Sequence, residues 1–263
     1  MVKGSAGVMS EMGDISTIGV TNTYNFAVRK EILGETDKST KPYLLFKLAA
    51  LSLATVLWSN LAAAQTSQPA VLHACTPVSE RTGELGCWIW SDEPIGALTR
   101  TQAFWHLYVY PTRAAAEAEK GQRGTVVEGL GKIWLMTIDE ESWKLASGER
   151  VAKIGLLPFT PGEKYSAQYM EAFFTPGMTA APHRHPGLEA WYTMSGQTCL
   201  ETPEGAQTGR AGGPPVIVPR GLPMHLTATG SEKRRAMVLV LHESSKPYSS
   251  PAKDWTPKGL CKN

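Results

Sequence analysis

The chain carries two histidines two residues apart, followed four residues later by a glutamate, in a segment with a glycine at each end. These residues are His183, His185 and Glu189, between Gly177 and Gly196. On an extended segment, residues i and i+2 point to the same face, so both imidazoles project together. The Pro-Gly pair after His185 predicts a turn that returns Glu189 on an adjacent strand. Two imidazoles and a carboxylate form a ligand set for a divalent transition metal.

The residues around this segment help to distinguish a metal site from a chance cluster at the surface. The run Gly, five residues, His-x-His, three residues, Glu, six residues, Gly matches the first signature of the cupin superfamily at every fixed position. A second segment, Gly213 to His225, resembles the second cupin signature, with Pro219 and Gly221 at its fixed positions. It departs from that signature in two ways. Three residues rather than two separate Gly221 from His225, and Thr229 replaces a frequent Asn.

The resemblance to cupins covers roughly residues 150–245 and implies a small antiparallel jelly-roll barrel with a metal inside. The implied cofactor is one divalent transition metal, which could be manganese, iron, zinc, copper or nickel. Three imidazoles and one carboxylate on a six-coordinate ion leave two positions for water, dioxygen or substrate. The implied ligands are His183, His185, Glu189 and His225.

Alternation along the strand of Glu189 suggests which other side chains enter the barrel. If Glu189 points inward, Trp191 and Thr193 do so too and line the pocket, although a tryptophan there is equally explained as core. No catalytic acid or base is assigned. Tyr169 and Glu171 are candidates on a neighbouring strand, and either could face solvent instead.

Cupins with this ligand set include dioxygenases, oxalate-type decarboxylases and isomerases, and others only bind small molecules. A fold does not select among these functions. The resemblance therefore implies a metal-dependent enzyme of oxygenase or decarboxylase type acting on a small molecule. The alternatives are a non-catalytic cupin that binds a small molecule beside its metal, and a metal with a purely structural role.

The charge balance argues against nucleic acid as a partner. The chain has 26 basic and 24 acidic residues among 263, and the basic residues are scattered. The short run from Lys233 to Arg235 is predicted to lie in a solvated turn between strands. We expect a small-molecule ligand or substrate as the partner, and a homodimer is left open.

The N-terminal region predicts export. Lys47 precedes an uncharged apolar run over 48–58, and three alanines at 62–64 come before Gln65. A basic flank, a short apolar segment and small residues before a cleavage site are typical of a secretory signal peptide. Residues 1–64 are predicted to be removed, leaving a periplasmic or secreted protein without a stable membrane span. An uncleaved anchor is the main alternative, and a start at Val28 would explain the late signal.

All four cysteines follow the predicted cleavage site. An even number of cysteines in an exported chain suggests disulfides, and four cysteines allow three pairings. We favour Cys75–Cys87, which closes a short loop, and Cys199–Cys261, which ties the C-terminal tail to the barrel.

The strand pattern predicts a mainly β fold with two parts. Residues 65–148 read as a small α+β region, with a helix over 113–120, or as a degenerate cupin without ligands. His106 in this region lies among aromatic residues and is predicted to be packed in the core rather than bound to metal. Residues 149–245 contain many short strands and form the cupin barrel, and 246–263 are a C-terminal tail.

Overall fold

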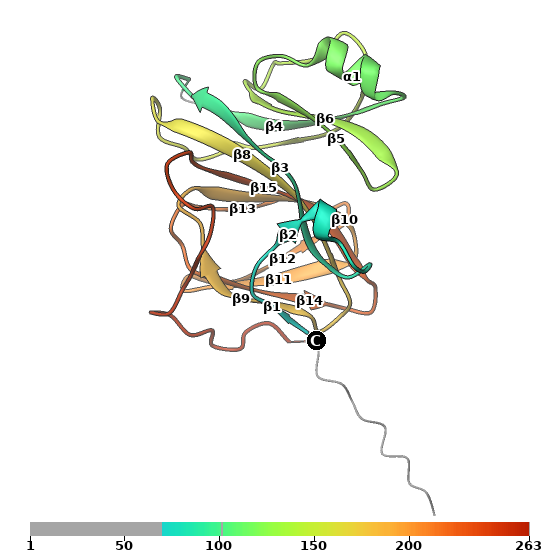
Figure 1. The fold of residues 1–263 in the computed structure, drawn as a ribbon. Coiled ribbons are helices and arrows are strands. Elements are labelled where there is room, and N and C mark those ends of the chain that lie inside the picture. The colour runs from blue at the N-terminus through green and yellow to red at the C-terminus, as the bar shows by residue number, and fades with distance from the viewer. Residues whose placement is uncertain (1–69, 101, 263) are drawn as a thin grey trace, which may run out of the picture. The chain divides into compact units, whose positions relative to one another are not determined.

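Strands make up most of the chain in the computed structural model, which describes residues 70–100 and 102–262 (Figure 1). The predicted signal peptide, its cleavage site before Gln65 and the alternative start at Val28 lie outside the described residues. Within the described ranges, no helix has the length and apolar character needed to cross a membrane.

The first sheet forms one wall of the barrel and carries the His-x-His segment. Its order is β1-β9-β14-β11-β12, with β16 also paired to β9. All its pairs are antiparallel except β1 with β9. The strands are β1 (Val71–Leu72), β9 (Thr179–Arg184), β11 (Gln197–Thr202), β12 (Gly205–Arg210), β14 (Met224–Thr229) and β16 (Ser250–Pro251).

The second sheet forms the opposite wall, in the order β13-β10-β15-β8-β3-β2. Apolar side chains from the facing sides of the two sheets fill one barrel core, among them Met170, Leu200, Leu226 and Val240. The predicted mainly β jelly-roll barrel is therefore confirmed. The strands are β2 (Thr76–Pro77), β3 (Gly86–Ala97), β8 (Lys164–Phe174), β10 (Leu188–Ser195), β13 (Val216–Val218) and β15 (Arg234–Glu243), and the short 3-10 helix η1 (Val78–Glu80) follows β2.

A third sheet of four strands, in the order β5-β6-β4-β7, covers the outer face of the second sheet (Figure 1). Trp105 and Trp134 of this sheet pack in one buried cluster with Tyr169 and Leu239 of the barrel wall. The helix α1 packs on its other face, and Thr112 caps that helix by accepting a hydrogen bond from the backbone N–H of Ala115. The elements are β4 (Phe104–Tyr110), α1 (Arg113–Glu119), β5 (Gly124–Gly129), β6 (Lys132–Asp139) and β7 (Glu149–Ile154).

The sheets do not divide at residue 148, where the sequence suggested a boundary. β3 lies before that point but pairs with β8 inside the barrel wall. β7 lies after it but pairs with β4 in the four-stranded sheet. The division into 65–148 and 149–245 therefore stays a prediction about domains, and the pairing of strands crosses it in both directions.

His106 is fully buried in β4, with Nε2 2.9 Å from the carbonyl oxygen of Glu140 and its ring against Trp143. Burial lowers its pKa, although the Glu140 and Asp139 groups partly oppose this effect. His106 is thus a packed histidine, as the sequence suggested.

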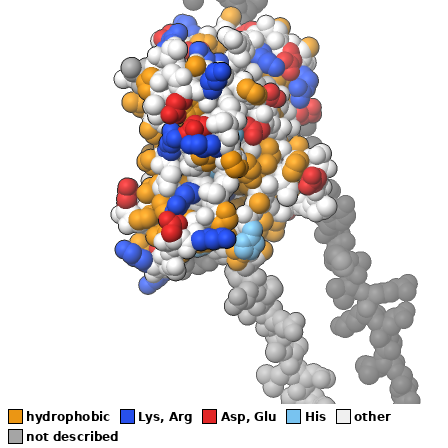
Figure 2. All heavy atoms as spheres, turned by 60° about the vertical axis from the view of Figure 1, so that its left-hand side comes forward, with side chains coloured by type: hydrophobic (Ala, Val, Ile, Leu, Met, Phe, Trp, Pro, Cys, Tyr) orange, Lys and Arg blue, Asp and Glu red, His pale blue; other side chains and the backbone are white. Residues whose placement is uncertain are grey.

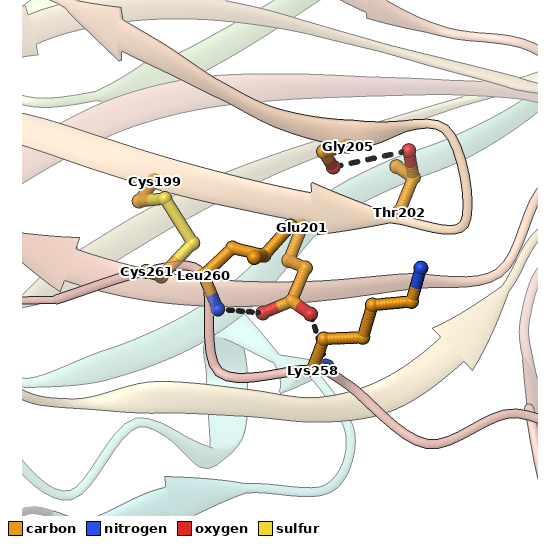
Figure 3. The surroundings of a disulfide bond; sticks show 7 residues. All are labelled: Cys199, Glu201, Thr202, Gly205, Lys258, Leu260 and Cys261. Atoms are coloured by element: carbon orange, nitrogen blue, oxygen red, sulfur yellow. Dashed lines mark hydrogen bonds between the residues drawn. A yellow bond between two sulfur atoms is a disulfide. The ribbon is translucent and has the colours of Figure 1, made fainter.

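Both favoured disulfides are present, so no cysteine is free. Cys199–Cys261 fastens the C-terminal tail across the outer face of β11 (Figure 3). On the same face, the buried carboxylate of Glu201 accepts hydrogen bonds from the backbone N–H groups of Lys258 and Leu260. The tail is therefore held by one covalent bond and two charge-assisted hydrogen bonds.

Removing each disulfide by paired Cys→Ala substitution is expected to destabilise the protein unequally. Loss of Cys199–Cys261 should lower the free energy of unfolding by about 4 kcal/mol and loss of Cys75–Cys87 by about 3 kcal/mol, because the closed loops span 62 and 12 residues. Chemical unfolding followed by circular dichroism measures both values. Thiol titration of the denatured, unreduced wild-type protein is the control and should find no free thiol, and the reverse order of stabilities would contradict the prediction.

Candidate metal centre

The two histidines of the first motif lie at the end of β9 and project to one face. Arg184, between them, points the other way and pairs with Asp254 on the tail. The chain then turns through Gly187 into β10, which carries Glu189. A Cβ atom at Gly187 would lie 1.7 Å from the carbonyl oxygen of Leu241, so only glycine allows the turn to pass this close to β15.

The three predicted ligands of the first motif come together. One possible ligand atom from each of His183, His185 and Glu189 lies within 4.8 Å of the other two. The two imidazole rings have centroids 5.0 Å apart, and His185 Nε2 lies 3.7 Å from Glu189 Oε2. Two of these side chains are buried and His183 is half-buried, so the cluster lies inside the barrel wall.

Backbone carbonyl groups fix the tautomer that each ring adopts when it is neutral. Nδ1 of His183 lies 2.7 Å from the carbonyl oxygen of Ala181, and Nδ1 of His185 lies 2.6 Å from that of Tyr248. A carbonyl oxygen only accepts, so Nδ1 carries the hydrogen in both rings and Nε2 keeps its lone pair. Burial, opposed in part by Glu189, lowers the pKa of His185 and favours the neutral ring that a metal needs.

Two buried atoms of the cluster lack a hydrogen-bond partner. They are His185 Nε2 and Glu189 Oε2, and both present lone pairs toward the cluster. Buried acceptors without a donor are costly, and a divalent cation between them would satisfy both. The residues present therefore fit the metal that the sequence motif implies.

A cavity of about 60 Å³ borders the cluster. Its wall is mostly apolar, with Met170, Phe174 and Val238 from the second sheet and Leu226 from the first. The Cys75–Cys87 disulfide and Tyr248 also lie on its edge. The site is thus a small, largely apolar chamber with few polar groups, as binding sites for small molecules commonly are.

Trp191 and Thr193 do not line this cavity. Trp191 points inward from β10 as alternation predicts, but it is 1% exposed and belongs to the barrel core. Thr193 lies further along the strand, away from the chamber, and is not among the lining residues. Of the two predictions for Trp191, pocket wall and core, its position agrees with the core.

His225, the fourth predicted ligand, is not part of the cluster. Met224 and Leu226, its neighbours on β14, both lie in the barrel core, so His225 points to the outer face. It lies opposite Glu201 in the β14–β11 register, on the face that the C-terminal tail covers. The extra residue after Gly221 explains this, since a shift of one residue moves a strand's side chains to the other face.

The extra residue also places Met224 where the fourth ligand was expected. Met224 is separated from Gly221 by two residues, the usual cupin spacing, and pairs with His183 in the β14–β9 register. It is 1% exposed and faces the same side as His183. The inner face therefore presents a thioether where the cupin signature has an imidazole.

Neither candidate for a catalytic acid or base reaches the cavity. Tyr169 is fully buried against Trp105 between the second and third sheets, and burial raises its pKa. Glu171 pairs with Arg81 at 3.1 Å on the outer face of β8. Alternation explains both positions, because Met170, between them, occupies the inner face.

The sequence interpretation missed Arg234. The run Lys233–Arg235 was predicted to be a solvated turn, which is wrong for Arg234 because it begins β15 and its side chain is 1% exposed. Alternation places it on the inner face with Val238 and Val240, and it lines the cavity. The sequence held a signal for this position. If β15 is extended back to Arg234, alternation from Val238 and Val240 places Arg234 on the inner face with them.

Comparison with known proteins finds similarity at the level of the fold. No protein-family model and no curated protein sequence matches the chain. A solved cupin-2 domain protein from Shewanella frigidimarina NCIMB 400 is 19% identical over 28% of this chain and 68% of its own, with a TM-score of 0.24. An oxalate oxidase is 23% identical over 35% of this chain and 49% of its own, with a TM-score of 0.28.

A DMSP lyase from Ruegeria pomeroyi DSS-3 is 20% identical over 35% of this chain and 45% of its own, with a TM-score of 0.29. Such low identities and scores say nothing about the substrate or reaction of this chain. Its own strand order gives a mainly β barrel, with His183, His185 and Glu189 clustered at its inner face.

Proposed function

We propose that this chain is an exported cupin protein that binds one divalent transition metal and acts as a metal-dependent enzyme on a small molecule. The observation that carries the proposal is the convergence of His183, His185 and Glu189, with two buried lone pairs unsatisfied, beside a partly open cavity. A purely structural metal would not need such a cavity.

The number of ligands favours an oxygenase-type reaction over a decarboxylase-type one. Two imidazoles and one carboxylate with open positions are the arrangement of non-haem iron(II) oxygenases. His225 lies on the outer face and adds no third imidazole. When bound, the metal would supply a Lewis acid with open coordination positions. The protein supplies two oriented imidazole rings, one carboxylate and a mostly apolar wall.

A non-catalytic cupin that binds a small molecule is the second candidate. Among the described residues that line the cavity, Glu189 is the only carboxylate, and both cysteines are in a disulfide. Apart from the metal ligands, the lining side chains suited to acid–base chemistry are His73 and Tyr248. Oxygen consumption or product formation by the metal-loaded protein, screened with phenols, organic acids and diketones, separates the two candidates. Turnover supports the enzyme, and saturable binding without turnover supports the alternative.

Substitution of the clustered ligands is expected to remove the metal. His185→Ala removes a direct bond, and Glu189→Gln removes the negative charge that offsets the cation. Each should weaken binding by at least about tenfold, since loss of an outer partner already costs about 10–100-fold. Elemental analysis after dialysis measures the stoichiometry. His225→Ala is the matched control and should keep the wild-type metal content. The metal site is refuted if the wild-type protein, tested with each candidate ion in turn, never retains close to one equivalent.

Met224→His is expected to strengthen metal binding. The substitution puts an imidazole opposite His183 on the inner face, where it can complete a set of three imidazoles and one carboxylate. An added ligand should raise the affinity by about tenfold or more. Competition with a chelator of known affinity measures the change. The double variant Met224→His/His225→Ala should bind as tightly as Met224→His, and a loss of affinity in the double variant would show that His225 is a ligand.

Export is supported by the two disulfides, because such bonds persist in oxidising compartments. The exported protein is expected to begin at or near Gln65, after removal of the basic and apolar N-terminal segment. N-terminal sequencing of protein recovered from the exported fraction tests this. Intact residues 1–64 on soluble cytoplasmic protein contradict it.

A further inference from the structure

Arg234 brings a positive charge into the barrel without a matching partner. Its side chain is 1% exposed and lines the same cavity as His183, His185 and Glu189. Nε and Nη2 of its guanidinium are buried and have no hydrogen-bond partner. Buried N–H groups without an acceptor are rare, and those of a charged group are the most costly.

The surroundings stabilise this charge only in part. The faces of Phe174 and Trp191 lie 5.2 and 5.4 Å from the guanidinium carbon, close enough for cation–π attraction. Aromatic rings are only weak acceptors, so the planar N–H groups of the guanidinium still lack strong hydrogen-bond acceptors. Among the described residues, no carboxylate lies within 4.0 Å of the guanidinium, although the more distant charge of Glu189 is felt. Burial lowers the pKa of Arg234 to about 10, so the group stays charged at neutral pH.

With a divalent metal bound, the sum of charges in the chamber calls for an anion. With neutral imidazoles, Glu189 contributes one negative charge and Arg234 one positive charge, and a divalent metal adds two more positive charges. A carboxylate is the anion that best matches the guanidinium, because its two oxygens accept from two N–H groups of the planar fork. The cavity of about 60 Å³ has room for only a few water-sized groups, so the ligand is compact.

We propose that Arg234 determines specificity by binding the carboxylate of a compact organic acid beside the metal site. The unsatisfied guanidinium supplies a fixed fork, and the apolar wall accepts the short carbon chain. The inference deepens the proposed function and rests on it for the position of the metal. It names small carboxylic acids, rather than neutral phenols or diketones, as the class of substrate or ligand.

Acetate and acetamide test the proposal, because they are nearly equal in shape and differ in charge. Isothermal titration calorimetry measures the affinity for each probe. It is performed on metal-free protein and on protein loaded with the ion that elemental analysis finds at close to one equivalent. Wild-type protein is expected to bind acetate at least about tenfold more tightly than acetamide, as expected for hydrogen bonds to a charged group.

The variants are Arg234→Lys, which keeps the charge but loses the fork, and Arg234→Met, which loses both. Acetate affinity should fall about tenfold or more in Arg234→Met and by less in Arg234→Lys, with metal content unchanged in both because Arg234 is not a ligand. Arg235→Met is the matched control. Arg235 is the next residue, points to the outer face over Phe173 and should have no effect. Thermal unfolding of each variant confirms that it is folded.

The outcomes separate this inference from the metal hypothesis. Acetate selectivity that is lost in Arg234→Met supports the inference. If no ion is retained, the proposed metal site fails, but metal-free wild-type protein should still prefer acetate over acetamide, and Arg234→Met should not. Equal affinity for the two probes in both forms, or unchanged acetate affinity in folded Arg234→Met, overturns the role of Arg234.

Discussion

The antiparallel pairing of β8, β15 and β10 is the interaction on which the rest of the molecule depends. Both faces of this wall are buried, so its side chains alternate between two cores. On β8, Tyr169 enters the cluster beneath the four-stranded sheet and Met170 enters the barrel. The same alternation on β10 sends Glu189 toward the cavity. The register of these three strands therefore sets the composition of the site as well as the packing of the third sheet.

The sequence was sufficient for the triad because its geometry is local. Only five residues lie between His183 and Glu189, so a strand, a turn and the start of the next strand place all three ligands. His225 depends instead on how a separate turn enters β14. The additional residue after Gly221 could be counted in the sequence, but its effect required knowing which neighbours of His225 enter the core. Arg234 was hidden for a similar reason, since a run of three basic residues looks solvated until the first residue of β15 is known.

Long-range pairing explains the remaining difference between sequence and structure. The pattern of short strands predicts a barrel, and the helix after β4 is recognisable from its alanines and the capping Thr112. The pairing of distant strands is not encoded at short range: paired residues of β3 and β8 are 67 to 87 positions apart in the sequence, and β7 crosses back to β4. Both choices follow from burial, because β3 extends the barrel wall and β7 extends the sheet that covers it.

The charges in the chamber link metal binding to anion binding. Without a metal, Glu189 is the acidic group whose charge is felt by Arg234, and it raises the pKa that burial lowers. A metal bound at His183 and His185 would offset the negative charge of Glu189. The positive charge of the Arg234 guanidinium would then be stabilised less by that carboxylate. Anion affinity should then rise, and by thermodynamic reciprocity an anion on Arg234 should tighten the metal by the same factor. A chamber with one carboxylate and one guanidinium can in this way favour the fully loaded state over either partial one, with no change in the fold.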